Sequence, residues 1–474
     1  MGRFEEYESY DAVGLAELVR KGQVNPKEIL DAAIALAEER NPRLNAIVVK
    51  MYDEAKAAVA SGLPEGPFRG VPFLLKDLYT YCEGVRVTNG SRFFQDYVSD
   101  HDTELVARYK RSGLVIFGRT ASPEFGLTST TESLLHGNTL NPWNHEHTAG
   151  GSSGGSASAV ASGILPAAHA SDGGGSIRIP ASCCGLFGLK PTRARVPMGP
   201  DVGEGWSGLS IMHAVTRSVR DSALLLDVTG GPDVGDPYWA PPPLRPFLEE
   251  IGVDPGRLRI ALVTQAFNGD ETHPDCEEAA KGAAEICEEL GHQVEEATLT
   301  VDAEALGAAI QVIVCANLRA NLEERARIVG REFSSEDVEP VTYAMATEVG
   351  SMNAAQYASA IRVIHATGRQ VGRFFENFDV LLTPTMATPP LKLGELALTQ
   401  TDATVFVENL RKTIGYTQLM NVAGNPAMSV PLFWNAKGLP VGVQFAGRFG
   451  DEATLFRLAS QLEKAHPWTH RRPS

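Results

Sequence analysis

The chain has 474 residues, of which 43% are apolar and 21% are charged, a balance that excludes disordered, collagen-like and coiled-coil proteins and leaves a globular one. Acidic residues outnumber basic residues by 58 to 42, which gives a formal net charge of −16. Because this charge repels polyphosphates and anionic lipids, we expect a small-molecule ligand, with no nucleic acid and no membrane as partner.

The first part of the chain alternates between helical and strand patterns. Residues 11–40 carry apolar side chains at helical spacing with a break near residue 22, and Asp11 and Pro26 suit the starts of two helices. Further runs typical of strands or a helix lie at 46–49, 71–75, 103–111 and 114–118. This alternation predicts an α/β fold.

Residues 137–208 depart from the alternation, because glycine, serine and proline crowd them. Because ordered apolar runs interrupt this segment, we expect tight loops that approach another group closely rather than low complexity. A proline-rich segment at 232–246 is the best candidate for a linker. Beyond it, strand and helix patterns resume at 259–264, 274–290, 302–378, 380–384, 427–431 and 441–447, followed by a final helix.

The six cysteines do not form a disulfide framework, because Cys183 and Cys184 are adjacent and the others are widely spread in a long chain. The first residues lack the basic and apolar segments of a signal peptide, and no apolar run reaches the length of about 18 residues that a membrane span needs. We therefore expect a cytoplasmic protein.

Two glycine-rich segments, 150–156 and 171–176, contain serines. Glycine permits positive φ and close backbone approach, so successive N–H groups can converge on one oxygen, which is how an oxyanion hole is built. Two tight turns with incidental serines are the alternative, and composition alone does not decide between them. Neither segment has the spacing of a phosphate-binding loop.

The first segment also satisfies the nucleophile-elbow pattern G-x-S-x-G, with Ser153 at the nucleophile position. An elbow needs a buried strand directly before the serine, whereas residues 141–149 are polar and turn-like, so the context opposes it. His136, His145 and His147 lie nearby without an accompanying carboxylate or thiol pattern. We expect them to be solvated loop histidines, and we expect no metal site.

Lys76 follows the apolar run at 71–75, so it lies at the end of a predicted buried strand. A buried amine loses hydration, which lowers its pKa from about 10.4 and makes it a neutral base near physiological pH. A surface lysine paired with Asp77 is the alternative. Strand alternation weakens that alternative, because it places the two side chains on opposite faces.

Together these segments resemble the amidase signature family. The similarity rests on GVPFLLKD from Gly70, NPW from Asn141, GGSSGGSASAVASG from Gly150 and SDGGGSIRIPASCCGLFGLKPT from Ser171, in that order. Ser152 and Ser176 are 24 residues apart, which is the family's spacing between its two active serines. Weaker similarity extends over nearly the whole chain.

The resemblance implies a serine hydrolase that needs no cofactor. Ser176 would be the nucleophile, Ser152 a bridging serine after a cis peptide bond, and Lys76 the base. The backbone amides of Gly173, Gly174, Gly175 and Ser176 would form the oxyanion hole. Asp172 and Arg178 would pair and stiffen that loop.

The resemblance also implies the fold: one α/β domain over residues 1–474, with a mixed sheet and helices on both faces. Its signature core would span about 65–225, and about 255–380 would shape substrate access. Gly173 and Ala121 depart from the family's usual residues. Neither departure touches the three catalytic positions.

Within the family, the chain is most similar to the hydrolases of 6-aminohexanoate cyclic dimers, the nylon oligomers, and urethane-cleaving members lie close by. This likeness rests on His169, Cys315 and PWTHRRP from Pro467. It implies that Gly126, Leu127 and Cys315 line the acyl pocket, although helix-core packing explains Cys315 equally well. The expected substrates are small uncharged amides, with cyclic amides and carbamates as further candidates.

Two other functions remain open at this point. One is an elbow-type esterase with Ser153 as nucleophile. The other is a noncatalytic amidotransferase-like subunit that binds a partner chain, although SIRIPA replaces the usual SIRQPA of that group. A homodimer is also left open.

Overall fold

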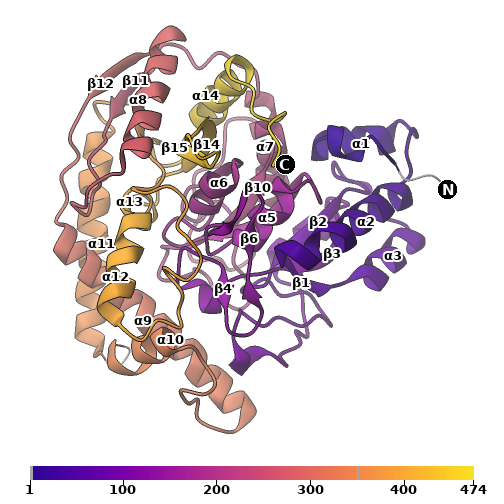
Figure 1. Cartoon of the computed structure of the whole chain (residues 1–474), viewed down its shortest axis with the longest axis horizontal. Helices are drawn as coiled ribbons and strands as arrows, with labels where there is room; N and C mark the ends of the chain where they lie inside the picture. The colour runs from indigo at the N-terminus through magenta and orange to yellow at the C-terminus, as the bar shows by residue number, and fades with distance from the viewer. Residues whose placement is uncertain (1–3, 350–351, 474) are drawn as a thin grey trace.

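The structure is a computed structural model that describes residues 4–349 and 352–473, and a mixed β-sheet lies at its centre (Figure 1). Within these residues, eight strands form the large sheet in the order β12-β11-β13-β15-β14-β9-β10-β8. Three more form a second sheet in the order β1-β3-β2. The strands of the large sheet are β8 (Ala167–Asp172), β9 (Phe187–Lys190), β10 (Ile211–Thr216), β11 (Arg259–Leu262), β12 (Gln293–Glu296), β13 (Val380–Pro384), β14 (Ala427–Trp434) and β15 (Pro440–Gly447). Those of the second are β1 (Ile47–Lys50), β2 (Pro72–Lys76) and β3 (Val115–Thr120).

The helices surround these sheets, with α9, α11 and α12 at the left of Figure 1 and α2 and α3 beside the second sheet at the right. The first seven are α1 (Ala12–Arg20), α2 (Pro26–Leu44), α3 (Tyr52–Ser61), α4 (Glu104–Arg111), α5 (Gly154–Ala161), α6 (Arg178–Cys184) and α7 (Val219–Thr229). The others are α8 (Pro274–Glu289), α9 (Ala303–Val329), α10 (Pro340–Ala344), α11 (Ala354–Phe374), α12 (Ala403–Ile414), α13 (Gln418–Ala423) and α14 (Glu452–Ala465).

Helices cover both faces of the large sheet, because alternate residues of its strands enter different apolar clusters. In β11, Ile260 packs in the cluster that includes α8 and α14, whereas Ala261 packs in the cluster that includes α9 and α11. Val380 and Leu381 of β13 divide in the same way. Parallel pairs at β11 and antiparallel pairs elsewhere make the sheet mixed. The predicted α/β architecture is therefore confirmed.

Local signals set most of the element boundaries. Asp11 caps α1 by accepting the N–H of Gly14, and Pro26 is the first residue of α2, where Asn25 and Glu28 form a capping box. The strand patterns predicted near 46, 71 and 114 became β1, β2 and β3.

This region, residues 137–208, combines the expected tight loops with ordered elements, which include α5, α6, β8 and β9. Its glycines serve helix packing as well as turns. A side chain at Gly154 or Gly155 would collide with Thr131 or with the backbone of Ala121, so glycine lets the start of α5 approach β3 closely.

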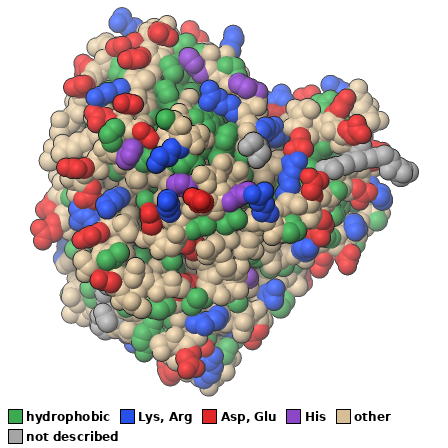
Figure 2. All heavy atoms as spheres, viewed as in Figure 1, with side chains coloured by type: hydrophobic (Ala, Val, Ile, Leu, Met, Phe, Trp, Pro, Cys, Tyr) green, Lys and Arg blue, Asp and Glu red, His purple; other side chains and the backbone are tan. Residues whose placement is uncertain are grey.

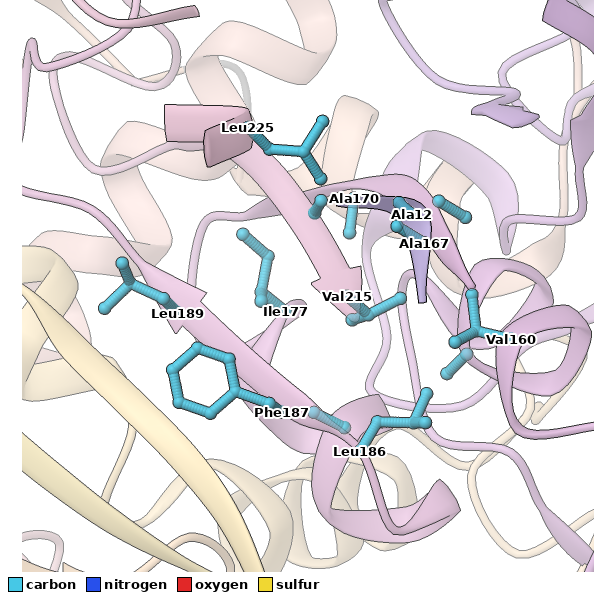
Figure 3. Packing of buried hydrophobic residues seen from close by; sticks show 14 of the residues in the cluster. Ala12, Val160, Ala167, Ala170, Ile177, Leu186, Phe187, Leu189, Val215 and Leu225 are labelled. Atoms are coloured by element: carbon cyan, nitrogen blue, oxygen red, sulfur yellow. The ribbon is translucent and has the colours of Figure 1, made fainter. Parts of the chain in front are cut away.

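The core lies directly behind the second serine segment. Figure 3 shows Ile177, the residue after Ser176, close to Phe187 and Leu189 of β9 and Val215 of β10. All four side chains are buried. This packing fixes the loop that carries Ser176 to the large sheet.

Among the described residues, α9 is the one helix whose length and composition could match a membrane span. Of its most apolar window, 44% is buried inside the protein, where the helix packs against α11. Such packing is typical of a core helix. The six cysteines are all free and buried. On the face drawn in Figure 2, acidic and basic side chains are interspersed.

Candidate active site

Lys76 ends β2 and is completely buried. Its Nζ lies 2.7 Å from the Oγ of Ser152 and 2.9 Å from the Oγ of Ser171. Burial lowers the pKa of the Lys76 amine to about 7, although the nearby Asp172 carboxylate opposes this shift. A substantial fraction of the amine is therefore neutral at physiological pH, with a lone pair that can accept the hydroxyl proton of Ser152.

Asp77 points to the opposite side of the strand, as the alternation predicted. Its carboxylate pairs with Arg119 at 3.0 Å, and both side chains are fully buried. The surface pair between Lys76 and Asp77 that the sequence left open is therefore absent from this part of the chain.

Ser152 follows a cis peptide bond between Gly151 and Ser152, as the resemblance implied. Its neighbours leave its hydroxyl little space. A Cβ on Gly126 would lie 3.0 Å from the Ser152 Oγ, and Gly126 itself has a φ of +71°. A side chain at Gly151 would collide with the backbone of Thr130. These glycines hold the chain tightly around the serine that Lys76 contacts.

Ser176 lies in the loop between β8 and α6 and lines a cavity of about 320 Å³. Ser152, Ser171, Gly173 and Gly126 line the same cavity. The two serines of the resemblance and the amine thus meet in one site. Further lining residues come from distant segments and include Leu78, Phe125, Trp206, Met212, Asn317 and Asn321.

The loop before Ser176 is held by a buried ion pair, as expected. Arg178 contacts Asp172 at 2.8 Å and also donates to the Gln444 side chain at 2.7 Å and the Asn421 side chain at 2.6 Å. Burial alone would raise the pKa of Asp172, but the Arg178 guanidinium lowers it to about 2. The carboxylate stays ionised and fixes the loop.

The same carboxylate changes the expected oxyanion hole. The N–H of Gly175 donates to Asp172 Oδ1 at 2.7 Å, so this amide is already engaged in forming the loop. The amides of Gly173, Gly174 and Ser176 remain as candidates. In this tight turn, the Asp172 carboxylate accepts from the backbone three residues ahead.

Ser153 does not occupy a nucleophile elbow. Its side chain is fully buried, donates to the carbonyl of Ser171 at 3.2 Å and does not line the cavity. A strand, β7 (Asn144–Thr148), does precede this segment, contrary to the expectation of turns, but it is mostly half-buried and pairs with the short β6 (Leu140–Asn141) outside the large sheet.

The three histidines near this segment also lie outside the cavity. His136 contacts Thr88 at 3.0 Å and His147 contacts the carbonyl of Pro390 at 2.8 Å, so these two are bonded within the protein rather than solvated. Within the described residues, no group of histidine, cysteine and carboxylate side chains could hold a metal ion.

Of the three residues expected to line the acyl pocket, Gly126 lines the cavity that contains Ser176. Leu127 packs in an apolar cluster, and Cys315 is fully buried in α9 without lining the cavity. Asn317 and Asn321, on the following turns of α9, line it instead. Ser171 was missed as a contact of Lys76. No local pattern indicated this contact, because it depends on the packing of β2 beside β8, two strands far apart in the sequence.

Known proteins match this chain over most of its length. A family model described as Amidase matches residues 28–456. The 6-aminohexanoate-cyclic-dimer hydrolase of Paenarthrobacter ureafaciens is 37% identical over 98% of this chain and 96% of its own. A solved structure of 6-aminohexanoate cyclic dimer hydrolase has a TM-score of 0.93 at 36% identity and covers 98% of this chain and 99% of its own. A bacterial aryl acylamidase of the amidase signature family has a TM-score of 0.88 at 28% identity, covering 97% of each chain.

Proposed function

The chain belongs to the amidase signature family, and from this premise we propose that Ser176, Ser152 and Lys76 are the triad with which this amidohydrolase cleaves C–N bonds. One observation carries the proposal. The Lys76 amine lies 2.7 Å from Ser152 at the wall of the cavity that Ser176 lines, and its pKa is about 7. A base poised near the working pH is what proton transfer from a hydroxyl requires.

The proposed reaction combines the Lys76–Ser152 contact with the place of Ser176 in the wall of the same cavity. The Ser176 hydroxyl gives its proton to Ser152 and attacks the carbonyl carbon, while Ser152 gives its own proton to the neutral Lys76 amine. Loop amides receive the negative charge that develops on the carbonyl oxygen. The proton on Lys76 then returns through Ser152 to the leaving nitrogen, the C–N bond breaks, and an amine departs. Water hydrolyses the acyl-enzyme by the same relay.

The proposed substrates are small uncharged amides, including cyclic amides, and carbamates. Support comes from the cavity wall near the serines, where Leu78, Phe125, Trp206 and Met212 present apolar surface. The relatives named above include cyclic-dimer hydrolases and an aryl acylamidase, which act on amides. We further propose that residues 255–380 shape substrate access, because Asn317 and Asn321 reach the cavity from α9.

We propose that the protein works in the cytoplasm, because all six cysteines are free and buried. The homodimer, the 1–474 domain boundary and the signature core at about 65–225 stay predictions.

A fluorophosphonate tests the triad directly, because it transfers its phosphonyl group to an activated serine and releases fluoride. We expect the intact protein to be labelled on Ser176, located by mass spectrometry of its peptides. Labelling of Ser153 would instead identify the elbow-type esterase. An unlabelled protein that forms a stable complex with a second chain would identify the amidotransferase-like subunit.

Gly173 and Trp206 are expected to set the shape of the acyl side of the cavity. A Cβ on Gly173 would lie 2.6 Å from the Trp206 ring, so Gly173→Ala must displace the indole. Because small changes in a pocket are worth about 10- to 200-fold in specificity, we expect kcat/KM for an aryl amide to fall at least about tenfold. Steady-state kinetics measure this.

Gly174→Ala is the matched control, because its Cβ would meet nothing nearer than Gln418 at 3.8 Å. In the double variant Gly173→Ala/Trp206→Ala the collision is absent, so its loss should be smaller than the product of the two single losses. If the loss of kcat/KM in the double variant equals the product of the two single losses, a direct contact between Gly173 and Trp206 is contradicted.

A further inference from the structure

Lys76 and its contact Ser171 come from two different sheets that meet at their edges. Lys76 ends β2, the edge strand of the three-stranded sheet, and Ser171 lies near the end of β8, the edge strand of the eight-stranded sheet. The two strands pack side by side. Among the described residues no ladder of paired strands joins them, so side chains must fix the position of Lys76 relative to the serines.

His169 of β8 makes the connection at Lys76. The backbone N–H of Lys76 donates to the Nδ1 of His169 at 3.2 Å. The next N–H along β2, that of Asp77, donates to Thr120 of β3, so the Lys76 N–H faces the opposite edge, as alternation along a strand requires. Without the imidazole this N–H would be buried with no strand partner.

The imidazole must be neutral to make this bond. An Nδ1 that accepts leaves the ring proton on Nε2, and this atom is buried without a partner among the described residues. Burial, with smaller effects of Lys76, Arg119 and His213, keeps the pKa of His169 well below its usual range. The ring therefore acts as a fixed acceptor and adds no charge beside the amine.

The same strand also holds the other end of Lys76. Ser171, two residues after His169 and on the same face, accepts from the Lys76 Nζ at 2.9 Å. The His169 carbonyl accepts a hydrogen bond from the Ser156 hydroxyl at 2.6 Å. The His169 imidazole packs edge-on against the Tyr109 ring. The backbone and the amine of Lys76 are thus both tied to β8.

We propose that His169 is a positioning residue for the reaction, whose neutral imidazole takes the place of a strand carbonyl and holds Lys76 where its amine reaches Ser152. The inference rests on the proposed triad. It assigns His169 no contact with substrate. A misplacement of about 1 Å in a catalytic group can cost about 100-fold in rate. Loss of the hydrogen bond between His169 and the Lys76 backbone should therefore lower kcat.

Two amide variants test the proposal. In His169→Asn the side-chain oxygen is bonded to Cγ, as Nδ1 is, and can still accept the Lys76 N–H. In His169→Gln the oxygen lies one bond further out and cannot take that place. We expect kcat of the Asn variant to stay within about threefold of the native value and kcat of the Gln variant to fall roughly 10- to 100-fold, with KM little changed in both.

His213 supplies the matched control. It is equally buried, lies on the neighbouring strand β10, and contacts Ser222 rather than Lys76. His213→Asn and His213→Gln should therefore lose similar fractions of kcat. If folding of a His169 variant is incomplete, the rate of fluorophosphonate labelling per folded molecule gives the same comparison.

The outcomes separate the inference from the function it rests on. Equal activity of the two His169 variants, or the same Asn-to-Gln difference at His213, would overturn the positioning role. Full turnover by Ser176→Ala would overturn the triad itself, whatever the His169 variants do.

Discussion

Ser176→Ala is expected to lower kcat by a factor on the order of 10⁶, as in other hydrolases that lose their nucleophilic serine. The hydroxyl that forms the acyl-enzyme is absent, and the remaining loop amides can stabilise only a slow direct attack by water. The fold should be unchanged, because the Ser176 side chain is half-buried at the cavity wall and the loop is held by Asp172 and Arg178. Release of amine from an aryl amide measures the effect.

Ser153→Ala is the matched control for this experiment. Both serines lie in glycine-rich segments, but the Ser153 hydroxyl bonds the Ser171 carbonyl and lies outside the cavity. We expect the Ser153 variant to lose a small part of its stability and to keep kcat within about tenfold, since the hydroxyl makes two buried hydrogen bonds to the Ser171 backbone and each is worth about 1 kcal/mol. Loss of activity in Ser153→Ala together with full activity in Ser176→Ala would replace the proposed mechanism with the elbow-type esterase.

Strand alternation made the centre of the site predictable from sequence. A lysine directly after an apolar run had to lie at the end of a buried strand, with Asp77 on the other face, and the structure shows both features. Local capping signals placed α1 and α2 equally well. The glycine-rich segments could be recognised as places where the backbone closely approaches another group. Composition did not distinguish a turn from the start of α5, because glycine is required in both where no side chain would fit.

The remaining features depend on contacts between distant segments, which no local pattern records. The turn at Asp172 engages the Gly175 amide because Arg178 and Asn421 donate to the carboxylate and hold it in place. Gln444 in turn accepts from Arg178. Cys315 turned out to be buried while Asn317 reaches the cavity, because the rotation of α9 about its axis is set by packing against α11. His169 could be seen in the sequence, yet its role depends on which strand lies beside β8.

Residues 4–349 and 352–473 include two buried lysines, and of these Lys76 alone contacts a serine. Burial brings the pKa of both Lys76 and Lys190 to about 7, but the Lys190 Nζ donates to the Pro191 carbonyl and does not line the cavity. Their comparison separates the general effect of a buried amine from catalysis. If the pH dependence of activity arises from stability alone, replacing either lysine should change it. If it arises from proton transfer through Ser152, replacing Lys76 should change it and replacing Lys190 should not.

Lys76→Met is therefore expected to lower kcat/KM by about 10²- to 10⁴-fold and to remove its acid limb. In the native protein the neutral amine is the active form, so kcat/KM should fall about tenfold per pH unit below pH 7 and level off above it. The Met variant has no titrating amine, and its residual rate should be flat across that range. Lys190→Met should keep the limb. A limb that survives in Lys76→Met would assign the base to another group, because no second amine contacts Ser152 within the described residues.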